Sequence, residues 1–141
     1  MMWVRRILVM GMLLGFCNSF ADVSKTLTIE KMSDENVSLA VLSTFNILKP
    51  NTLPTIYNPV QLNKEVTRYN ITVGDKVGVV EFLLTETLAD NTTRRICEVT
   101  SVQREDLLPG FVDTNVVNNA QSDLLCIVML DGSALTVQKR H

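Results

Sequence analysis

The residue types that carry most enzyme chemistry are scarce in this chain. Its single histidine is His141, the last residue, so a Ser-His-Asp or Cys-His arrangement has no suitable base. Zinc-ligand clusters are missing for the same reason. Gly74 and Gly78 lack the Lys-Ser/Thr pair of a phosphate-binding loop. We therefore expect a protein that is not an enzyme and that uses neither a metal nor another cofactor.

Two pairs of adjacent carboxylates are the remaining candidates for acid–base chemistry. They are Asp34-Glu35 and Glu105-Asp106. A catalytic pair needs unequal environments for its two carboxyl groups, set by burial and neighbouring charge. Adjacent acidic residues are more often a solvated surface, and we interpret both pairs in this way.

The N-terminus has the layout of a secretory signal peptide. Arg5 and Arg6 precede an apolar run at residues 7–16, and small residues stand at Ser19 and Ala21. A transmembrane anchor is the alternative, but the run is shorter than the ~20 apolar residues that a bilayer requires. We expect a signal peptide at residues 1–21 and one domain at residues 22–141, secreted to the extracellular space.

The net charge of the chain after signal cleavage indicates which classes of partner to expect. Losing Arg5 and Arg6 would lower the 13 basic residues to 11 against 15 acidic ones, a net charge of about −4. No basic patch is visible, so we expect no nucleic-acid partner. No other segment is long enough to span a bilayer, so we expect no membrane partner after signal cleavage.

Two cysteines, Cys97 and Cys126, remain after the expected cleavage. In an oxidising compartment such a pair most simply forms one disulfide. Closing a loop of about 30 residues would stabilise the fold by roughly 3–4 kcal/mol in the chain-entropy model. Two thiolates without a histidine would make a poor zinc site.

Three sequons are candidate N-glycosylation sites in a secreted chain. Their acceptor residues are Asn36, Asn70 and Asn91. Asn91 lies in a predicted turn, which makes it the strongest of the three.

The element that organises the chain is a long antiparallel hairpin predicted at residues 79–102. Both arms are rich in β-branched and apolar residues, and polar turn residues separate them. Cys97 lies on the second arm. Further strands are predicted at residues 26–29, 66–73, 124–130 and 133–138, and a long polar connection at residues 105–123.

A helix is predicted at residues 33–49. Ser33 is a suitable N-cap, and acidic residues follow it in the first turn. Val37, Val41, Phe45 and Leu48 recur at helical spacing. The expected fold class is therefore α+β, with one helix packed across a four- to five-stranded twisted antiparallel sheet.

This layout resembles that of secreted cystatins over most of residues 23–130. The shared features are a signal peptide, one helix, a strand ending at a glycine loop, a hairpin carrying one cysteine and a later strand carrying its partner. The resemblance implies a wedge that inhibits papain-like cysteine proteases. It also implies that the Cys97–Cys126 pair matches the C-terminal bridge of that family.

The resemblance implies protease-binding loops at two places. The first loop matches residues 74–78 (Gly74, Asp75, Lys76, Val77 and Gly78) in our preferred register, or residues 70–74 in the other. The second loop falls at Glu105 and Asp106, where cystatins have Pro-Trp. Cystatins also have a glycine near the mature N-terminus, and this chain has none at residues 22–73.

These departures leave three functional hypotheses. The first is an inhibitor of papain-like cysteine proteases with degenerate wedge motifs and weak or absent inhibition. The alternative is a non-inhibitory secreted binding or structural module. A small ligand carrier is the third, and it would need a large apolar cavity.

Overall fold

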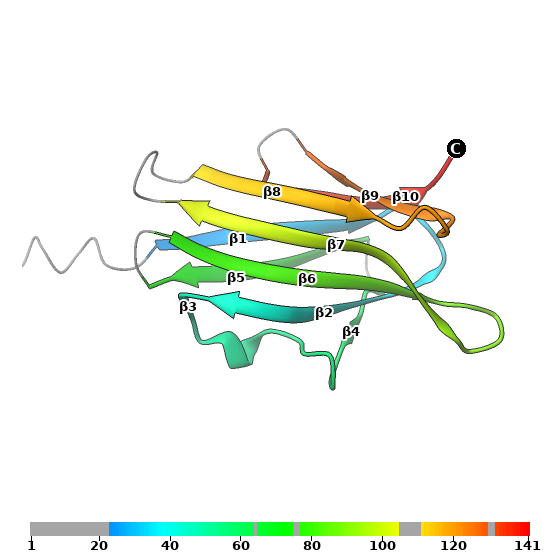
Figure 1. The fold of residues 1–141 in the computed structure, drawn as a ribbon, viewed down its shortest axis with the longest axis horizontal. Coiled ribbons are helices and arrows are strands. Elements are labelled where there is room, and N and C mark those ends of the chain that lie inside the picture. The colour runs from blue at the N-terminus through cyan, green and yellow to red at the C-terminus, as the bar shows by residue number, and fades with distance from the viewer. Residues whose placement is uncertain (1–22, 64, 75–76, 105–110, 130–131) are drawn as a thin grey trace, which may run out of the picture.

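The computed structural model describes residues 23–63, 65–74, 77–104, 111–129 and 132–141. These residues form two five-stranded sheets that pack face to face (Figure 1). The elements in chain order are β1 (Val23–Lys31), β2 (Asn36–Phe45), β3 (Ile47–Leu48), the 3-10 turn η1 (Pro50–Thr52), β4 (Val60–Gln61), β5 (Val66–Val73), β6 (Val77–Thr87), β7 (Thr93–Arg104), β8 (Phe111–Asn118), β9 (Leu124–Val128) and β10 (Ala134–Lys139).

The two sheets are named here by their edge strands. The β3–β9 sheet has the order β3-β5-β1-β10-β9, and the β4–β8 sheet has the order β4-β2-β6-β7-β8. β1 pairs with β10 in parallel, whereas the other strand pairs within the described sheets are antiparallel. The first and last strands are therefore neighbours at the centre of the β3–β9 sheet.

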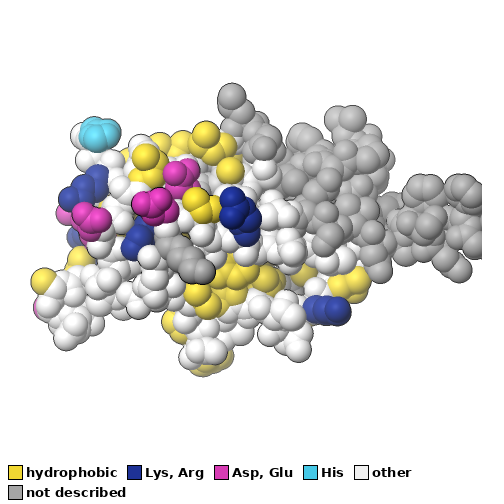
Figure 2. Space-filling model, turned by 180° about the vertical axis from the view of Figure 1, so that it is seen from behind, with side chains coloured by type: hydrophobic (Ala, Val, Ile, Leu, Met, Phe, Trp, Pro, Cys, Tyr) yellow, Lys and Arg dark blue, Asp and Glu magenta, His cyan; other side chains and the backbone are white. Residues whose placement is uncertain are grey.

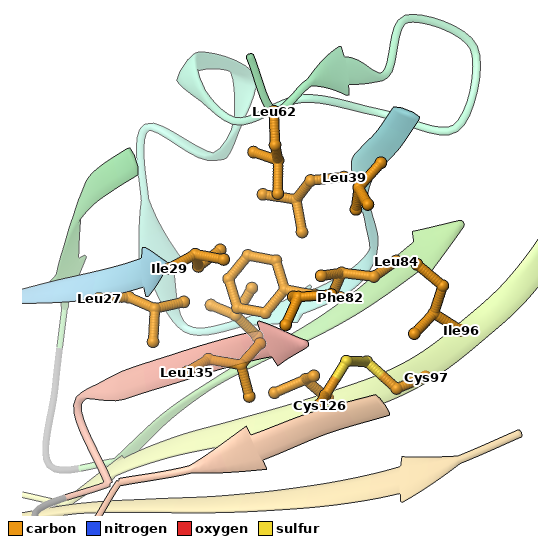
Figure 3. Packing of buried hydrophobic residues seen from close by; sticks show 14 of the residues in the cluster. Leu27, Ile29, Leu39, Leu62, Phe82, Leu84, Ile96, Cys97, Cys126 and Leu135 are labelled. Atoms are coloured by element: carbon orange, nitrogen blue, oxygen red, sulfur yellow. A yellow bond between two sulfur atoms is a disulfide. The ribbon is translucent and has the colours of Figure 1, made fainter. Parts of the chain in front are cut away.

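The core lies between the sheets and follows from the period-two pattern of the strands. Along β6 every second residue is buried, including Val80, Phe82 and Leu84. Ile71 and Val73 of β5 and Leu135 of β10 cover the opposite side. Figure 3 shows Phe82 at the centre of this cluster. Burial of one face of each sheet is what fixes the strand registers.

A β-bulge changes which residues of β7 face the core. Leu84 pairs with Cys97, and Thr85 pairs with Arg95, so Ile96 has no partner in β6. The extra residue lets two consecutive side chains, Ile96 and Cys97, both be fully buried.

The predicted α+β fold is wrong, because the segment expected to be a helix forms strands. Residues 36–45 are β2, and Ile47 and Leu48 are β3. Phe45 and Leu48 of the expected apolar stripe are 65% and 42% exposed, so no helical face exists. Instead, burial in this segment follows the strand alternation of Val37, Leu39 and Val41.

The physical reason lies in tertiary pairing. β2 contains two Val residues, one Thr and one Phe, which fit a pleated surface well. It pairs with β6 from Asn36 to Phe45, and a partner strand outweighs a weak helix preference. Asn46 then has a positive φ of 55°, which separates β2 from β3 and would interrupt any helix there.

Several other sequence expectations can be compared directly. The hairpin is confirmed as β6 and β7, and the strand at residues 66–73 is confirmed as β5. Strands at residues 26–29, 124–130 and 133–138 are confirmed as β1, β9 and β10, with shifted ends. The polar connection at residues 105–123 is wrong in part, because it contains β8.

The segment from η1 to β4 closes one side of the sandwich. β3 and β4 are only two residues long, so strand pairing alone covers little of this side. Leu53 and Leu62 are buried there, and the Leu62 N–H donates to Val37 O at 2.7 Å. This segment therefore covers one side of the core, mostly without regular strand structure.

Replacing Leu62 by alanine should therefore destabilise the protein. We expect a loss of about 2–4 kcal/mol in the free energy of unfolding, because a fully buried side chain leaves a cavity. Urea unfolding of the oxidised protein measures it. The matched control is Val117→Ala on β8, where the side chain is 59% exposed and the change should stay within about 0.5 kcal/mol. Equal losses of unfolding free energy in the two variants would contradict the role of this segment in covering the core.

Candidate functional site

Cys97 and Cys126 lie at disulfide-bond distance, as expected from the sequence. Their sulfur atoms are 2.00 Å apart and their Cα atoms 6.3 Å apart. Cys97 belongs to β7 and Cys126 to β9, so the bond joins the two sheets covalently. Both residues are buried at the end of the hydrophobic cluster (Figure 3).

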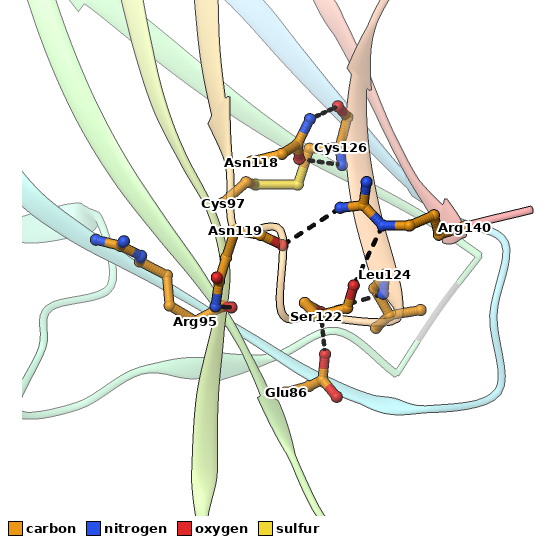
Figure 4. Close-up of a disulfide and its surroundings, with 9 residues drawn as sticks. All are labelled: Glu86, Arg95, Cys97, Asn118, Asn119, Ser122, Leu124, Cys126 and Arg140. Atoms are coloured by element: carbon orange, nitrogen blue, oxygen red, sulfur yellow. Dashed lines mark hydrogen bonds between the residues drawn. A yellow bond between two sulfur atoms is a disulfide. The ribbon is translucent and has the colours of Figure 1, made fainter.

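A side-chain clamp lies next to the disulfide. Asn118 of β8 is the strand partner of Cys97. Its Nδ2 donates to Cys126 O at 3.1 Å, and its Oδ1 accepts from the Cys126 N–H at 2.8 Å (Figure 4). One amide side chain thus satisfies both backbone groups of Cys126 on the open side of β9. The β8–β9 side of the sandwich is closed by this pair of bonds and the disulfide together.

A buried carboxylate lies at the end of the sandwich that holds the β8–β9 connection. Glu86 is 4% exposed, and its Oε1 accepts from Arg94 Nη2 at 2.8 Å. Its Oε2 accepts from the Ser122 hydroxyl, whose oxygen in turn accepts from the Leu124 N–H at 3.1 Å. Both oxygens are satisfied, so this cluster positions the connection and offers no free base or nucleophile.

Arg140 completes this polar cluster from the C-terminal side. Its Nε donates to Ser122 O and its Nη2 donates to Asn119 O, each at 3.3 Å (Figure 4). Its backbone N–H donates to Asp123 O at 2.7 Å. The connection between β8 and β9 is therefore held by charge-assisted bonds to backbone carbonyls.

The residues proposed as protease-binding loops are only partly described. Asp75, Lys76, Glu105 and Asp106 lie outside the described residues. In the described part, β6 begins beside the end of β7, because Val77 pairs with Arg104 and Gly78 with Gln103. The two chain segments that lead into the proposed loops are thus neighbours.

Gly78 has a packing role. It is buried, and a Cβ added there would lie 2.9 Å from Ile47 Cδ1 and 2.9 Å from Val73 Cγ2. It therefore lets β6 approach the β3–β5 corner of the other sheet closely. Gly74 is partly exposed, and its N–H donates to Asn46 O at 3.1 Å. Of the three described loop residues, Gly78 faces the core.

The three candidate glycosylation residues are all exposed. Asn91 lies in the β6–β7 turn, as expected, with a φ of 66°. Asn70 Oδ1 accepts from Thr26 Oγ1 at 2.9 Å, and Asn36 Oδ1 accepts from Gln61 Nε2 at 3.2 Å. Surface exposure is compatible with modification of each, which remains a prediction.

The described residues offer no metal centre. No group of three or more His, Cys, Asp or Glu side chains converges among them. Nor does any helix within the described ranges have the length and apolar character of a membrane span. Neither result adds a chemical function to the polar clusters above.

Two open pockets lie beside the turn between β1 and β2, with volumes of about 460 and 370 Å³. Met32, Ser33 and Asp34 line both. Both are open to solvent and lined mostly by polar or charged residues, unlike the enclosed apolar cavity that a ligand carrier would need.

Glu35 follows this turn and has a perturbed carboxyl group. Burial alone would raise its pKa, but its own backbone N–H, Lys139 and the Ser33 hydroxyl outweigh that effect. Together they hold the Glu35 pKa below its usual value of 4.5. Lys139 Nζ lies 3.3 Å from Glu35 Oε1, and the carboxylate therefore joins the last strand to the start of β2.

The most unusual surface is an apolar edge formed by the chain between β2 and β4. It consists of exposed hydrophobic side chains along the side that η1 and β4 close, namely Leu42, Phe45, Leu48, Ile56, Tyr57 and Val60. Figure 1 shows β3, η1 and β4 along the lower edge of the molecule. In Figure 2 most of the visible acidic side chains gather away from this edge, in the upper left part.

The tip of the apolar edge is a tight turn that presents two large side chains. The Thr55 N–H donates to Asn58 O at 3.3 Å, and the Asn58 N–H donates to Thr55 O at 3.1 Å. Ile56 and Tyr57 occupy the two central positions, 53% and 92% exposed. Such positions normally hold Gly, Asn, Asp or Pro, so an exposed Ile-Tyr pair is unusual there.

The sequence between residues 50 and 63 has two features that mark this edge and that the sequence-based site predictions did not include. Pro54 and Pro59 bracket the turn, and they restrict the backbone on both sides of it. In addition, Lys49 is the only charged residue between positions 36 and 63. The turn is thus uncharged, bracketed by prolines and contains an aromatic residue.

Comparisons with protein-family models, with curated proteins and with solved structures found no match to this chain. The cystatin resemblance thus has no support beyond the layout of features. One of those features, the helix, is a pair of strands.

Replacing Glu35 by glutamine should weaken the fold in a pH-dependent way. Because the folded-state pKa is lowered, the ionised carboxylate stabilises the fold at neutral pH, and this contribution is lost as the pH falls below about 4.5. The side chain is 35% exposed, so we expect a difference below about 1 kcal/mol. Urea unfolding of wild type and Glu35→Gln from pH 7 to pH 3 measures it.

A double-variant cycle with Lys139→Ala controls for unrelated effects. In the Glu35→Gln background this second change should cost little more, because its partner carboxylate is already neutral. A difference between wild type and Glu35→Gln that grows as the pH falls would contradict the assignment.

Proposed function

We propose that this protein is an exported, disulfide-bonded β-sandwich that acts by binding and does not catalyse a reaction. The binding surface is the apolar edge. The single observation that carries the proposal is the 92% exposure of Tyr57 at the tip of a turn between Pro54 and Pro59.

The composition of this edge supports a binding role. Interfaces are enriched in aromatic residues and depleted of charge at their centre, and tyrosine is frequent among the residues that dominate binding energy. The edge combines Phe45 and Tyr57 with aliphatic side chains, and Lys49 is the only charged residue in its chain segment, residues 36–63. The two prolines restrict the turn before binding, which lowers the entropy lost on association.

The position of the edge also suits binding. The apolar edge lies beside β3 and β4, which are edge strands of the two sheets. The opposite edge strands are β9 and β8, and the disulfide is on that side of the sandwich. The covalent link and the Asn118 clamp therefore stabilise one side of the sandwich. The exposed apolar side chains on the other side are not part of the core and can therefore serve in binding.

Inhibition of papain-like cysteine proteases is the second candidate. What favours it is the pairing of Gly78 with Gln103, which brings the segments leading into both proposed loops together. The helix of the cystatin layout is replaced by β2 and β3, so the candidate rests on this adjacency alone.

An inhibition assay with papain tests this second candidate. We expect no tight, stoichiometric inhibition, because neither proposed loop has the apolar anchor that a desolvated protease cleft requires. Stoichiometric inhibition by the oxidised protein that is lost on reduction of Cys97 and Cys126 would contradict the binding-module proposal and favour the inhibitor.

Site-specific photocrosslinking tests the binding-module proposal. Benzoylphenylalanine is placed at position 57, and at position 115 on β8 as the matched exposed control. We expect the exported protein to form a discrete adduct, with either a protein or a lipid, from position 57 at the cell surface or in the medium, and none from position 115. Excess wild-type protein should suppress the adduct, whereas Ile56→Ser/Tyr57→Ser protein should not.

Two outcomes would contradict the proposal. One is the absence of any adduct from position 57. The other is an equal pattern of adducts from the two positions, which would indicate random collision.

A further inference from the structure

We propose that the apolar edge inserts into the interfacial region of a lipid bilayer, with the Ile56–Tyr57 turn leading. This inference rests on the proposed function, since it names what that binding surface takes. Interfacial insertion requires no membrane-spanning segment. The sequence-based expectation of no membrane partner considered spanning segments only, so the present inference differs from it.

The first argument is shape. The turn at residues 55–58 is closed by two backbone hydrogen bonds between Thr55 and Asn58, and it protrudes from the lower edge of the sandwich in Figure 1. Tyr57 at 92% exposure contacts almost nothing of its own chain. A bilayer interface accepts a convex apolar protrusion of any outline, whereas a protein partner would need a pocket shaped for it.

The second argument is the chemistry of the tip. Tyrosine has an apolar ring and a polar hydroxyl, and it is enriched where membranes meet water. Ile56 beside it is purely apolar, while Thr55 and Asn58 at the base of the turn are uncharged hydrogen-bonding residues. This order places apolar groups deepest and neutral polar groups at the depth of the lipid headgroups.

The third argument is charge. Residues 36–63 contain no Asp or Glu, although the whole chain has 15 of them. The segment itself thus brings no carboxylate to an anionic surface, although Glu81 of β6 accepts a hydrogen bond from Ser43 at 2.9 Å and lies beside the edge. Lys49 is its only cation, and one basic residue adds only about 1 kcal/mol near an anionic membrane. Binding should therefore depend on apolar area and only weakly on anionic lipid or salt.

The fourth argument is that the edge has more than one apolar group. Phe45 at the end of β2 is 65% exposed, and Leu48 of β3 is 42% exposed. They lie on the same side of the sandwich as the turn, because β3 and β4 are the edge strands of the two sheets there. Several shallow anchors give reversible attachment, as expected for a peripheral protein.

Vesicle flotation tests the inference. The probe is the exported, oxidised protein, with its processed N-terminus determined by mass spectrometry, mixed with phosphatidylcholine vesicles or with vesicles that also contain phosphatidylglycerol. We expect wild type to float with both, with little effect of salt. Ile56→Ser/Tyr57→Ser should lower the partition coefficient by about tenfold or more, because two apolar side chains leave the interface.

The matched control is Val117→Ser on β8, which removes an apolar side chain of 59% exposure from the opposite side of the sandwich. Its partition coefficient should stay within about twofold of wild type. Circular dichroism and urea unfolding of each variant show that it is folded. If Ile56→Ser/Tyr57→Ser is unstable, Tyr57→Ser alone should still reduce partitioning by about threefold or more.

Any one of several results would overturn the inference. They are no flotation of wild type, full retention by the turn variant, equal loss in Val117→Ser, and binding to anionic vesicles alone that salt abolishes. A vesicle-free dimer that Ile56→Ser/Tyr57→Ser dissociates would assign the edge to a second copy and also overturn it. A protein adduct from position 57 without flotation would overturn this inference and leave the proposed function standing.

Discussion

The covalent link between the two sheets is the constraint on which the rest of the structure depends. Cys97 and Cys126 lie on strands of different sheets and are both buried, so the disulfide fixes how the sheets face each other. The bulge at Ile96 brings Cys97 into the core, and the Asn118 side chain satisfies the backbone of Cys126. A loop of 29 residues in sequence is thereby closed, which restricts the unfolded chain.

The opposite side of the sandwich is built differently. Two short strands and the irregular segment between them cover it, with Leu53 and Leu62 filling the space between the sheets. Several exposed side chains of the same segment are large and apolar, and Tyr57 is almost fully exposed. Contiguous exposed apolar patches usually mark an interaction surface. The molecule thus has a cross-linked side and an opposite side on which large apolar side chains are exposed.

The sequence predicts much of the strand content and misses how it is arranged. The hairpin at residues 79–102 and the strand at residues 66–73 follow from clear alternation and turn residues. Residues 36–45 fit both periods, since Val37 and Val41 are four apart and Val37, Leu39 and Val41 alternate. Only pairing with β6 decides between them, and pairing depends on residues distant in the sequence. The parallel contact of β1 with β10 joins the two ends of the domain, which no local pattern encodes.

Nuclear magnetic resonance shifts of the oxidised protein test the central claim most directly, because the account depends on two sheets joined by one disulfide. We expect strand-type Cα and Cβ shifts throughout residues 36–45 and oxidised-type Cβ shifts at Cys97 and Cys126. The Tyr57 amide should show the averaged signals of an exposed turn. Helical shifts at residues 36–45, or reduced cysteines in the folded protein, would contradict the sandwich and with it the position of the apolar edge.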